Sequence, residues 1–223
     1  MSIKSKSNRA IGVEDFMSKR FVTLNFDGVW RNTLGEPEAN FRMLVYGHPG
    51  NGKTEFCMQF AKYLCSFDKK VYFNSFEQGI SKSLQTCLER NAMREVKGKI
   101  IFGNKENLEE MANRLSNRNS PHFVFIDSRD YMNLTKEQYI SLVERFPHKS
   151  FIIICWEDAK KPKGTHAKAI EYMADIKVHV KRFKAYPRSR FEGNQVYTIW
   201  DKPTNTEAPA KEEAPNLFTP QPQ

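Results

Sequence analysis

The sequence predicts an α/β domain with a mostly parallel sheet between two layers of helices, ending in antiparallel edge strands. Short apolar runs alternate along the chain with amphipathic stretches of helical spacing. A glycine-rich loop lies between the first of these runs and the first helix-like stretch. The 223 residues leave room for one such domain with a substantial core, and too little for two large ones.

The strands are predicted from the apolar runs. The most apolar run is Phe-Ile-Ile-Ile-Cys-Trp at residues 151–156, and the run at 122–126 ends at Asp127. Such runs are typical of strands buried on both faces of a parallel sheet. Two later segments alternate apolar and polar residues, which favours antiparallel edge strands. In chain order, the predicted strands are 41–46, 71–75, 100–102, 122–126, 151–156, 178–180 and 196–200.

The helices are predicted from apolar residues that recur on one face. A helix of about three turns begins at Lys53, and a helix over 80–93 is expected to bury Ile80, Leu84 and Cys87. A Thr-x-x-Gln pattern that begins at Thr135 is typical of a capped helix start. The remaining predicted helices cover 108–115, 135–146 and 167–176.

The two ends of the chain differ in composition from the middle. Residues 1–20 are polar and basic and are predicted to form a flexible arm, followed by the folded domain at 21–202. Within this domain, residues 21–37 are apolar enough to pack against the sheet as a leading segment. Residues 203–223 are rich in Pro, Ala, Glu and Gln, which predicts a disordered tail. The Asn-Leu-Phe sequence at 216–218 is a candidate contact for a protein partner.

Charge and cysteine usage narrow the class of protein. The formal net charge is +9, which suits a polyanionic partner and equally suits solubility alone. The chain starts without a secretory signal and has no apolar run near the roughly 20 residues that span a bilayer. We therefore expect a cytoplasmic protein with no membrane partner. The four cysteines have no CxxC spacing and are expected to be reduced core thiols rather than zinc ligands.

Residues 47–54 read Gly-His-Pro-Gly-Asn-Gly-Lys-Thr and match the phosphate-binding pattern GxxxxGK[ST]. Glycines let successive backbone N–H groups turn toward an anion, and the following helix directs its positive end at the charge. Lys53 is expected to reach the β- and γ-phosphates, and Thr54 to offer its hydroxyl to Mg²⁺. The pattern predicts an ATP and Mg²⁺ site formed by Gly47, His48, Pro49, Gly50, Asn51, Gly52, Lys53 and Thr54.

Two carboxylates stand where a metal ion and an attacking water would need them. Asp127 ends a buried strand and is a candidate for the Mg²⁺ shell, although a strand-ending Asp can also cap a turn. Glu77 follows the strand at 71–75 and suits polarisation of a water, with a solvated turn glutamate as the alternative. The spacing alone leaves both alternatives open.

Together these motifs resemble the RecA-like ATPase core of the RadA, KaiC and replicative-helicase type over about residues 40–200. The resemblance rests on the loop at 47–54, on Tyr-Phe-Asn-Ser-Phe-Glu-Gln-Gly at 72–79, on Phe-Ile-Asp-Ser at 125–128, on Ala-Asp at 174–175 and on Arg-Ser-Arg-Phe at 188–191.

The resemblance implies roles for three residues. Glu77 would be the catalytic base. Arg188 and Arg190 would reach the ATP site of a neighbouring subunit in a ring or filament, where a guanidinium offsets charge that develops in phosphoryl transfer. The alternative for the two arginines is a solvated hairpin.

The sequence departs from this family after Cys155, where Trp156 and Glu157 stand in place of a polar γ-phosphate sensor. This departure puts coupling to a DNA-binding loop in doubt. The compact layout resembles small stand-alone ATPases of bacterial phages and mobile elements, which would place the protein in the cytoplasm of a bacterial host.

A basic region follows the last parallel strand. Residues 160–190 contain ten Lys or Arg and two acidic residues. Lys160, Lys161 and Lys163 lie in a loop-like segment and are candidates for phosphate contacts with single- or double-stranded DNA. A solvated loop with subunit contacts is the alternative.

Three functions compete at this point. The first is an Mg²⁺-dependent ATPase that assembles into a homo-oligomer and acts on DNA in recombination, repair or replication. The second is a nucleotide-gated binding module with little turnover. The third is a small P-loop kinase, which would need an arginine-bearing lid and an acceptor pocket.

Overall fold

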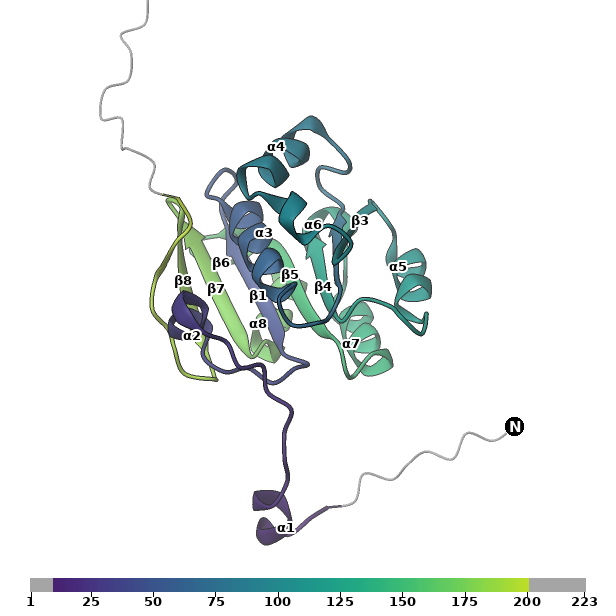
Figure 1. The fold of residues 1–223 in the computed structure, drawn as a ribbon, viewed down its shortest axis with the longest axis vertical. Helices are drawn as coiled ribbons and strands as arrows, with labels where there is room; N and C mark the ends of the chain where they lie inside the picture. Colours follow the sequence, from purple (N-terminus) through teal and green to yellow (C-terminus); the bar gives the residue numbers. More distant parts are fainter. Residues whose placement is uncertain (1–9, 201–223) are drawn as a thin grey trace, which may run out of the picture.

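The computed structural model describes residues 10–200. Residues 1–9 of the predicted arm and the predicted tail at 203–223, with its candidate partner contact at 216–218, lie outside them. Within residues 10–200, nine strands form one sheet in the order β3-β2-β4-β5-β1-β7-β8-β9, with β6 paired to β5 (Figure 1). The strands are β1 (Arg42–Gly47), β2 (Val71–Ser75), β3 (Ile100–Asn104), β4 (Phe123–Asp127), β5 (Ser150–Asp158), β6 (Lys161–Pro162), β7 (Ile176–Lys181), β8 (Lys184–Ser189) and β9 (Tyr197–Thr198).

The sheet is mostly parallel, as the sequence predicts. The strands from β3 to β7 in the sheet order pair in parallel, whereas β8 and β9 continue the sheet as antiparallel strands. The predicted edge strand at 178–180 lies instead inside the sheet, because β7 pairs in parallel with β1 and antiparallel with β8. β8 was not predicted from the sequence, since only Ala185 and Pro187 of its six residues are buried and neither is a strong strand former.

The helices cover the regions that the periodicity predicts, with shifts at their ends. The helix expected at 80–93 is divided into α4 and a 3₁₀ helix, and Ile80 is 73% exposed because α4 begins only after the N-cap Ser81. The helix expected at 167–176 lies three residues earlier, so that Ile176 begins β7. The helices are α1 (Val13–Met17), α2 (Gly28–Leu34), α3 (Lys53–Leu64), α4 (Lys82–Arg90), η1 (Met93–Val96), α5 (Leu108–Leu115), α6 (Arg129–Met132), α7 (Lys136–Arg145) and α8 (Gly164–Met173).

One helix start is confirmed in detail. Thr135 caps α7, its hydroxyl accepting a hydrogen bond from the Gln138 backbone N–H while the Gln138 side chain accepts from the Thr135 N–H. This reciprocal arrangement satisfies two N–H groups that a helix end otherwise leaves unpaired.

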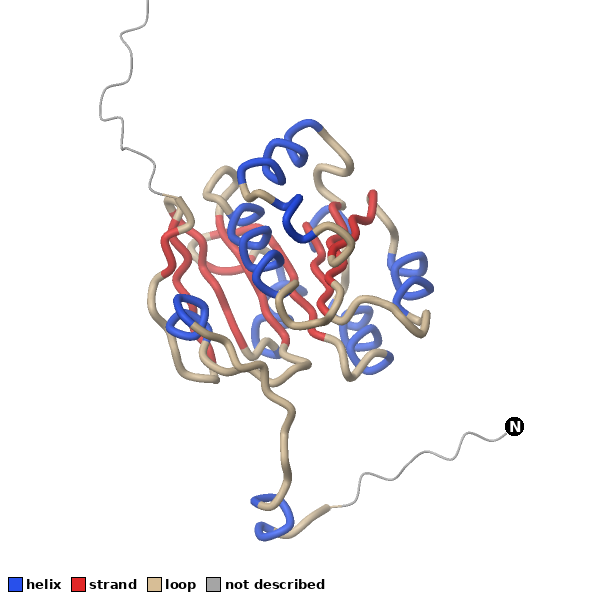
Figure 2. The backbone as a smooth tube through the Cα atoms, viewed as in Figure 1, coloured by secondary structure: helices blue, strands red, loops and turns tan. Residues whose placement is uncertain are grey.

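Helices lie on both faces of the sheet and form two cores (Figure 2). Successive side chains of β1 point to opposite faces of the sheet. Val45 therefore packs in the core beneath α2, α3 and α4, and Leu44 packs in the core beneath α5, α7 and α8. The leading segment belongs to the first core through Phe26, Trp30 and Leu34. The four cysteines lie buried in the core, as expected.

Across residues 10–200, no helix combines the length and apolar character needed to cross a membrane.

Candidate active site

The glycine-rich loop joins the carboxyl end of β1 to the first residue of α3. Gly50 and Gly52 both adopt positive φ, at 76° and 96°, which glycine reaches without strain. A Cβ added at Gly50 would meet nothing within 4 Å, so this part of the backbone faces open space. Gly47 has a different requirement, because its Cβ would lie 2.2 Å from the Val180 carbonyl oxygen. The loop therefore presents an open backbone turn at the positive end of α3.

Lys53 folds back over this loop. Its Nζ donates hydrogen bonds to the carbonyl oxygens of Gly47, at 2.8 Å, and His48, at 3.1 Å. The side chain is largely buried, yet it lines the open cleft beside the loop. These bonds hold the ammonium group where it can exchange a carbonyl partner for a phosphate oxygen, which is a stronger, charge-assisted acceptor.

Thr54 and Asp127 meet beneath the loop. The Thr54 hydroxyl donates to Asp127 Oδ2 at 3.0 Å. Asp127 ends β4 and is only 2% exposed, and burial together with the nearby charge of Glu77 raises its pKa to about 7. Ionisation of this carboxyl group is unfavourable in the absence of a cation, and a cation close to it would stabilise the ionised form.

This pair fits a magnesium ion. In residues 10–200, no group of three or more His, Cys, Asp or Glu side chains could hold a metal ion unaided. Mg²⁺ is usually bound through one or two protein oxygens while phosphates and waters complete its shell. The Ser128 hydroxyl beside the pair is also buried without a hydrogen-bond partner. Thr54 and Asp127 therefore supply the donor set that Mg²⁺ uses with a bound phosphate.

Glu77 lies in the same cleft as the loop. It follows β2 in a turn whose backbone is fixed by a hydrogen bond of 2.8 Å from the Glu77 N–H to the Asp127 carbonyl oxygen. The cleft has a volume of about 390 Å³ and is lined by Lys53, Thr54 and Glu77 among others. The structure thus brings together the loop, the contact between Thr54 and Asp127, and the predicted base.

Two aromatic residues in the cleft were not predicted. Phe183 lies in the turn between β7 and β8, and its N–H donates to the Asn51 carbonyl oxygen at 3.2 Å. Trp200 packs edge-on against Phe183, and the Arg90 guanidinium lies 5.5 Å from the Trp200 ring. This turn could not be predicted, because its second strand, β8, was not recognised in the sequence.

Arg188 and Arg190 lie away from this cleft. Arg188 stands opposite Lys177 on β7, and Arg190 is 3.4 Å from Asp175, the residue before β7. Because β8 runs antiparallel to β7 and β1, both arginines lie at the end of the sheet opposite the glycine-rich loop. Both are exposed, and neither lines the cleft of its own chain.

Lys160, Lys161 and Lys163 are exposed on the short hairpin of β5 and β6, with Lys160 in the turn, Lys161 in β6 and Lys163 directly after it. The hairpin is anchored by a backbone hydrogen bond from Lys163 to Trp156, and the Lys163 ammonium lies 5.1 Å from the Trp156 ring.

At the base of this hairpin, Glu157 is buried between two histidines. It lies 2.9 Å from His179 and 3.8 Å from His48 of the glycine-rich loop. From the sequence, Glu157 was only a departure from the family pattern, with no predicted contacts. Its contacts connect the loop to the hairpin that carries the lysines.

Comparisons with known proteins support the fold. Neither the protein-family models nor the curated proteins include a match to this chain. Among solved structures, the chain is similar to a KaiC-like protein from the hyperthermophilic archaeon Pyrococcus horikoshii, with a TM-score of 0.54 and 19% sequence identity. The match covers 77% of this chain and 88% of the other. The chain therefore shares the α/β fold of that KaiC-like protein.

Proposed function

We propose that this protein binds and hydrolyses ATP in a Mg²⁺-dependent reaction. The observation that carries the proposal is the contact between Thr54 and Asp127 directly beneath an open glycine-rich loop. A hydroxyl and a carboxylate placed in this way would hold a Mg²⁺ ion, which would supply positive charge beside a bound phosphate. The similarity to a KaiC-like fold is consistent with this chemistry.

The residues of the cleft have separate roles in the proposed reaction. Backbone N–H groups of the loop and the Lys53 ammonium bind the phosphates, and Thr54 and Asp127 would hold Mg²⁺. When bound, the ion would supply positive charge that offsets the negative charge of the phosphates. Glu77 orients a water and accepts its proton as the water attacks the γ-phosphorus.

We further propose that copies of the chain assemble so that Arg188 and Arg190 complete the site of a neighbour. Their position at the far end of the sheet supports a role between subunits, because they do not line the cleft of their own chain. DNA would bind along the hairpin of Lys160, Lys161 and Lys163, whose base contacts the glycine-rich loop through Glu157. The resemblance to ATPases of phages and mobile elements stays a prediction.

Binding of labelled ATP tests the proposal most directly. The parent protein should take up ATP saturably with Mg²⁺, and Lys53→Ala should weaken this uptake by roughly 100-fold or more through loss of a charge-assisted contact. Lys168→Ala, at an exposed position on α8, is the matched control and should bind as the parent does. Equal uptake by Lys53→Ala would refute the proposed site.

Turnover separates the ATPase from a nucleotide-gated module. A switch keeps its function when Glu77 is replaced, whereas an ATPase loses turnover. Transfer of the γ-phosphate to a small acceptor in place of release to water would instead identify a kinase.

A further inference from the structure

One face of the hairpin of β7 and β8 lies outside both cores. The other face packs in the first core through Val178, Val180 and Ala185. Successive side chains of a strand point to opposite faces, so the intervening residues point to the side of α8. Among the described residues, the core beneath α5, α7 and α8 includes none from β7 or β8. We call this surface the open face, and its residues, all half-buried or exposed, are Lys177, His179, Lys181, Lys184, Tyr186 and Arg188.

The open face carries four cations, and neither of its strands contains a carboxylate. The register of the hairpin places Lys177 opposite Arg188, and it places Lys181 opposite Lys184. Like charges directly opposite each other destabilise a pair of strands. Glu157 contacts the face through His179, but its side chain is only 4% exposed and already accepts a hydrogen bond of 2.9 Å from that ring. The two like-charged pairs therefore favour an anionic ligand, which would neutralise them.

A row of three aromatic rings crosses the same face. Tyr46 of β1 stacks on His179, with 4.9 Å between the ring centroids and 9° between the ring planes. Tyr186 continues the row, with its ring centroid 6.4 Å from that of His179. The register explains the row, because His179 is the strand partner of both tyrosines. Tyr186 is 41% exposed, and the pairing of β9 with β8 stops at Ala185. The row thus ends in an exposed ring on which another flat group can stack.

Single-stranded DNA combines the two chemistries that this face accommodates. Its backbone is a polyanion, and its unpaired bases present flat faces that stack on aromatic side chains. In a duplex the bases are paired and stacked on one another, so a surface ring finds no free base. A row of rings between two pairs of cations is therefore suited to a single strand more than to a duplex.

We propose that the open face binds single-stranded DNA, with one base stacked on Tyr186 and the flanking phosphates bound by Lys181 and Lys184. None of these three side chains lines the cleft beside the glycine-rich loop. The inference goes beyond the proposed function, since it needs neither ATP turnover nor the lysines of the β5–β6 hairpin.

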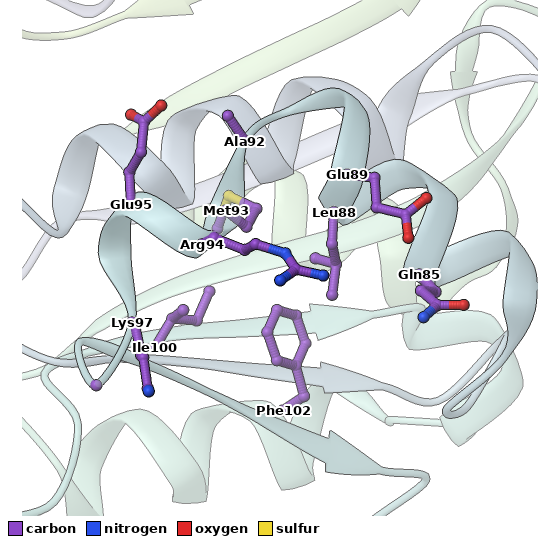
Figure 3. Close-up of a pocket in the computed structure, with 11 residues that line it drawn as sticks. Gln85, Leu88, Glu89, Ala92, Met93, Arg94, Glu95, Lys97, Ile100 and Phe102 are labelled. Atoms are coloured by element: carbon purple, nitrogen blue, oxygen red, sulfur yellow. The ribbon is translucent and has the colours of Figure 1, made fainter.

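A pocket elsewhere on the molecule supplies a matched comparison. It has a volume of about 710 Å³ and lies between α4, η1 and β3. Arg94 and Lys97 line it together with Glu89 and Glu95 (Figure 3). Cations that alternate with carboxylates attract a polyanion weakly. Removal of Arg94 and Lys97 therefore lowers the net charge as much as removal of Lys181 and Lys184, on a surface that is not expected to bind DNA.

Fluorescence anisotropy of a labelled oligodeoxyadenylate, measured without nucleotide, tests the proposal. Tyr186→Ala should weaken binding by about tenfold through loss of a stacked base, and Tyr186→Phe, which keeps the ring, should bind nearly as the parent does. Lys181→Ala with Lys184→Ala should reduce the slope of log affinity against log salt by about 1.4, the value for two phosphates of a single strand. Arg94→Ala with Lys97→Ala is the control and should leave the slope nearly unchanged.

A duplex probe and an ATP assay make the result specific. Tyr186→Ala should bind a labelled duplex as the parent does, because paired bases offer no face to the ring. The same tenfold loss for single strands should appear when Lys160, Lys161 and Lys163 are already replaced by Ala. ATP uptake by Tyr186→Ala is measured separately and should equal that of the parent, so failure of the open face is distinguishable from failure of the ATP site.

Four results would overturn the proposal, provided that circular dichroism shows each variant to be folded. The first is a parent that does not bind the single strand, and the second is unchanged affinity of Tyr186→Ala. The third is an equal loss of slope in the Arg94 and Lys97 control, which would show that binding follows net charge alone. The fourth is full competition by oligoglutamate at the same charge concentration, which would identify an acidic protein surface as the better ligand.

Discussion

Thr54 and Asp127 lie 73 positions apart in the sequence, and 3.0 Å separates the Thr54 hydroxyl oxygen from Asp127 Oδ2. The contact exists because β1 and β4 both end at the same edge of a parallel sheet, with β5 between them. We expect Asp127→Asn to lower ATP turnover by at least roughly 100-fold, since the amide keeps the shape but loses the charge that Mg²⁺ requires. Phosphate release across Mg²⁺ concentrations is the measurement. A rate restored by excess Mg²⁺ would show that Asp127 contributes only affinity, and an unchanged rate would show that it has no role.

The same substitution should stabilise the metal-free protein at high pH. The pKa of Asp127 is raised from 3.8 to about 7 in the folded state, so folding is favoured while the group is protonated and this contribution is lost as pH rises from about 4 through 7. At pH 8 in the presence of a chelator, Asp127→Asn should raise the free energy of unfolding, measured by denaturant titration, by about 1–3 kcal/mol. The difference should shrink toward pH 4. A variant less stable than the parent at pH 8 would contradict the assignment of a costly buried charge.

Glu77→Gln should separate binding from hydrolysis. The amide cannot accept the proton of an attacking water, so turnover should fall by roughly 100-fold or more while Mg²⁺-dependent ATP binding stays within a few-fold of the parent. Filter binding and phosphate release on the same preparation measure both. Glu89→Gln, an exposed glutamate on α4, is the control. Full turnover by Glu77→Gln would leave the nucleotide-gated module as the better function.

The sequence was sufficient to predict the glycine-rich loop, its lysine and threonine, and the carboxylate after β4, because these signals are local. Most strands of the sheet were also predictable, because each buried strand is a run of apolar residues and this signal is local as well. The sequence did not reveal the turn at Phe183, since β8 buries only Ala185 and Pro187 and carries no apolar pattern. It also gave no sign that Glu157 lies between two histidines, because that cluster joins three strand ends through pairing across the sheet.

A site shared between copies should show complementation. Arg188→Ala and Lys53→Ala should each be nearly inactive alone, since the first lacks the proposed trans-acting group and the second lacks its own phosphate contact. In a mixture, an intact Lys53 cleft of one chain can meet an intact Arg188 of the next, so activity should rise above the sum of the two. Lys177→Ala, at the neighbouring position on β7, is a control for lost charge on that surface. A mixture with only additive activity would place Arg188 outside the ATP site.

The lysines of the β5–β6 hairpin should govern DNA affinity through its dependence on salt. If Lys160, Lys161 and Lys163 each neutralise one phosphate, their joint replacement by Ala should reduce the slope of log affinity against log salt by about 2 for single strands. Fluorescence anisotropy with a labelled oligonucleotide measures this slope. A control that removes three exposed cations outside the basic region, at Lys69, Arg118 and Lys136, should leave the slope nearly unchanged even though the net charge falls equally. Equal losses in the two triple variants would show that affinity follows net charge alone, and the hairpin would then have no special part in binding.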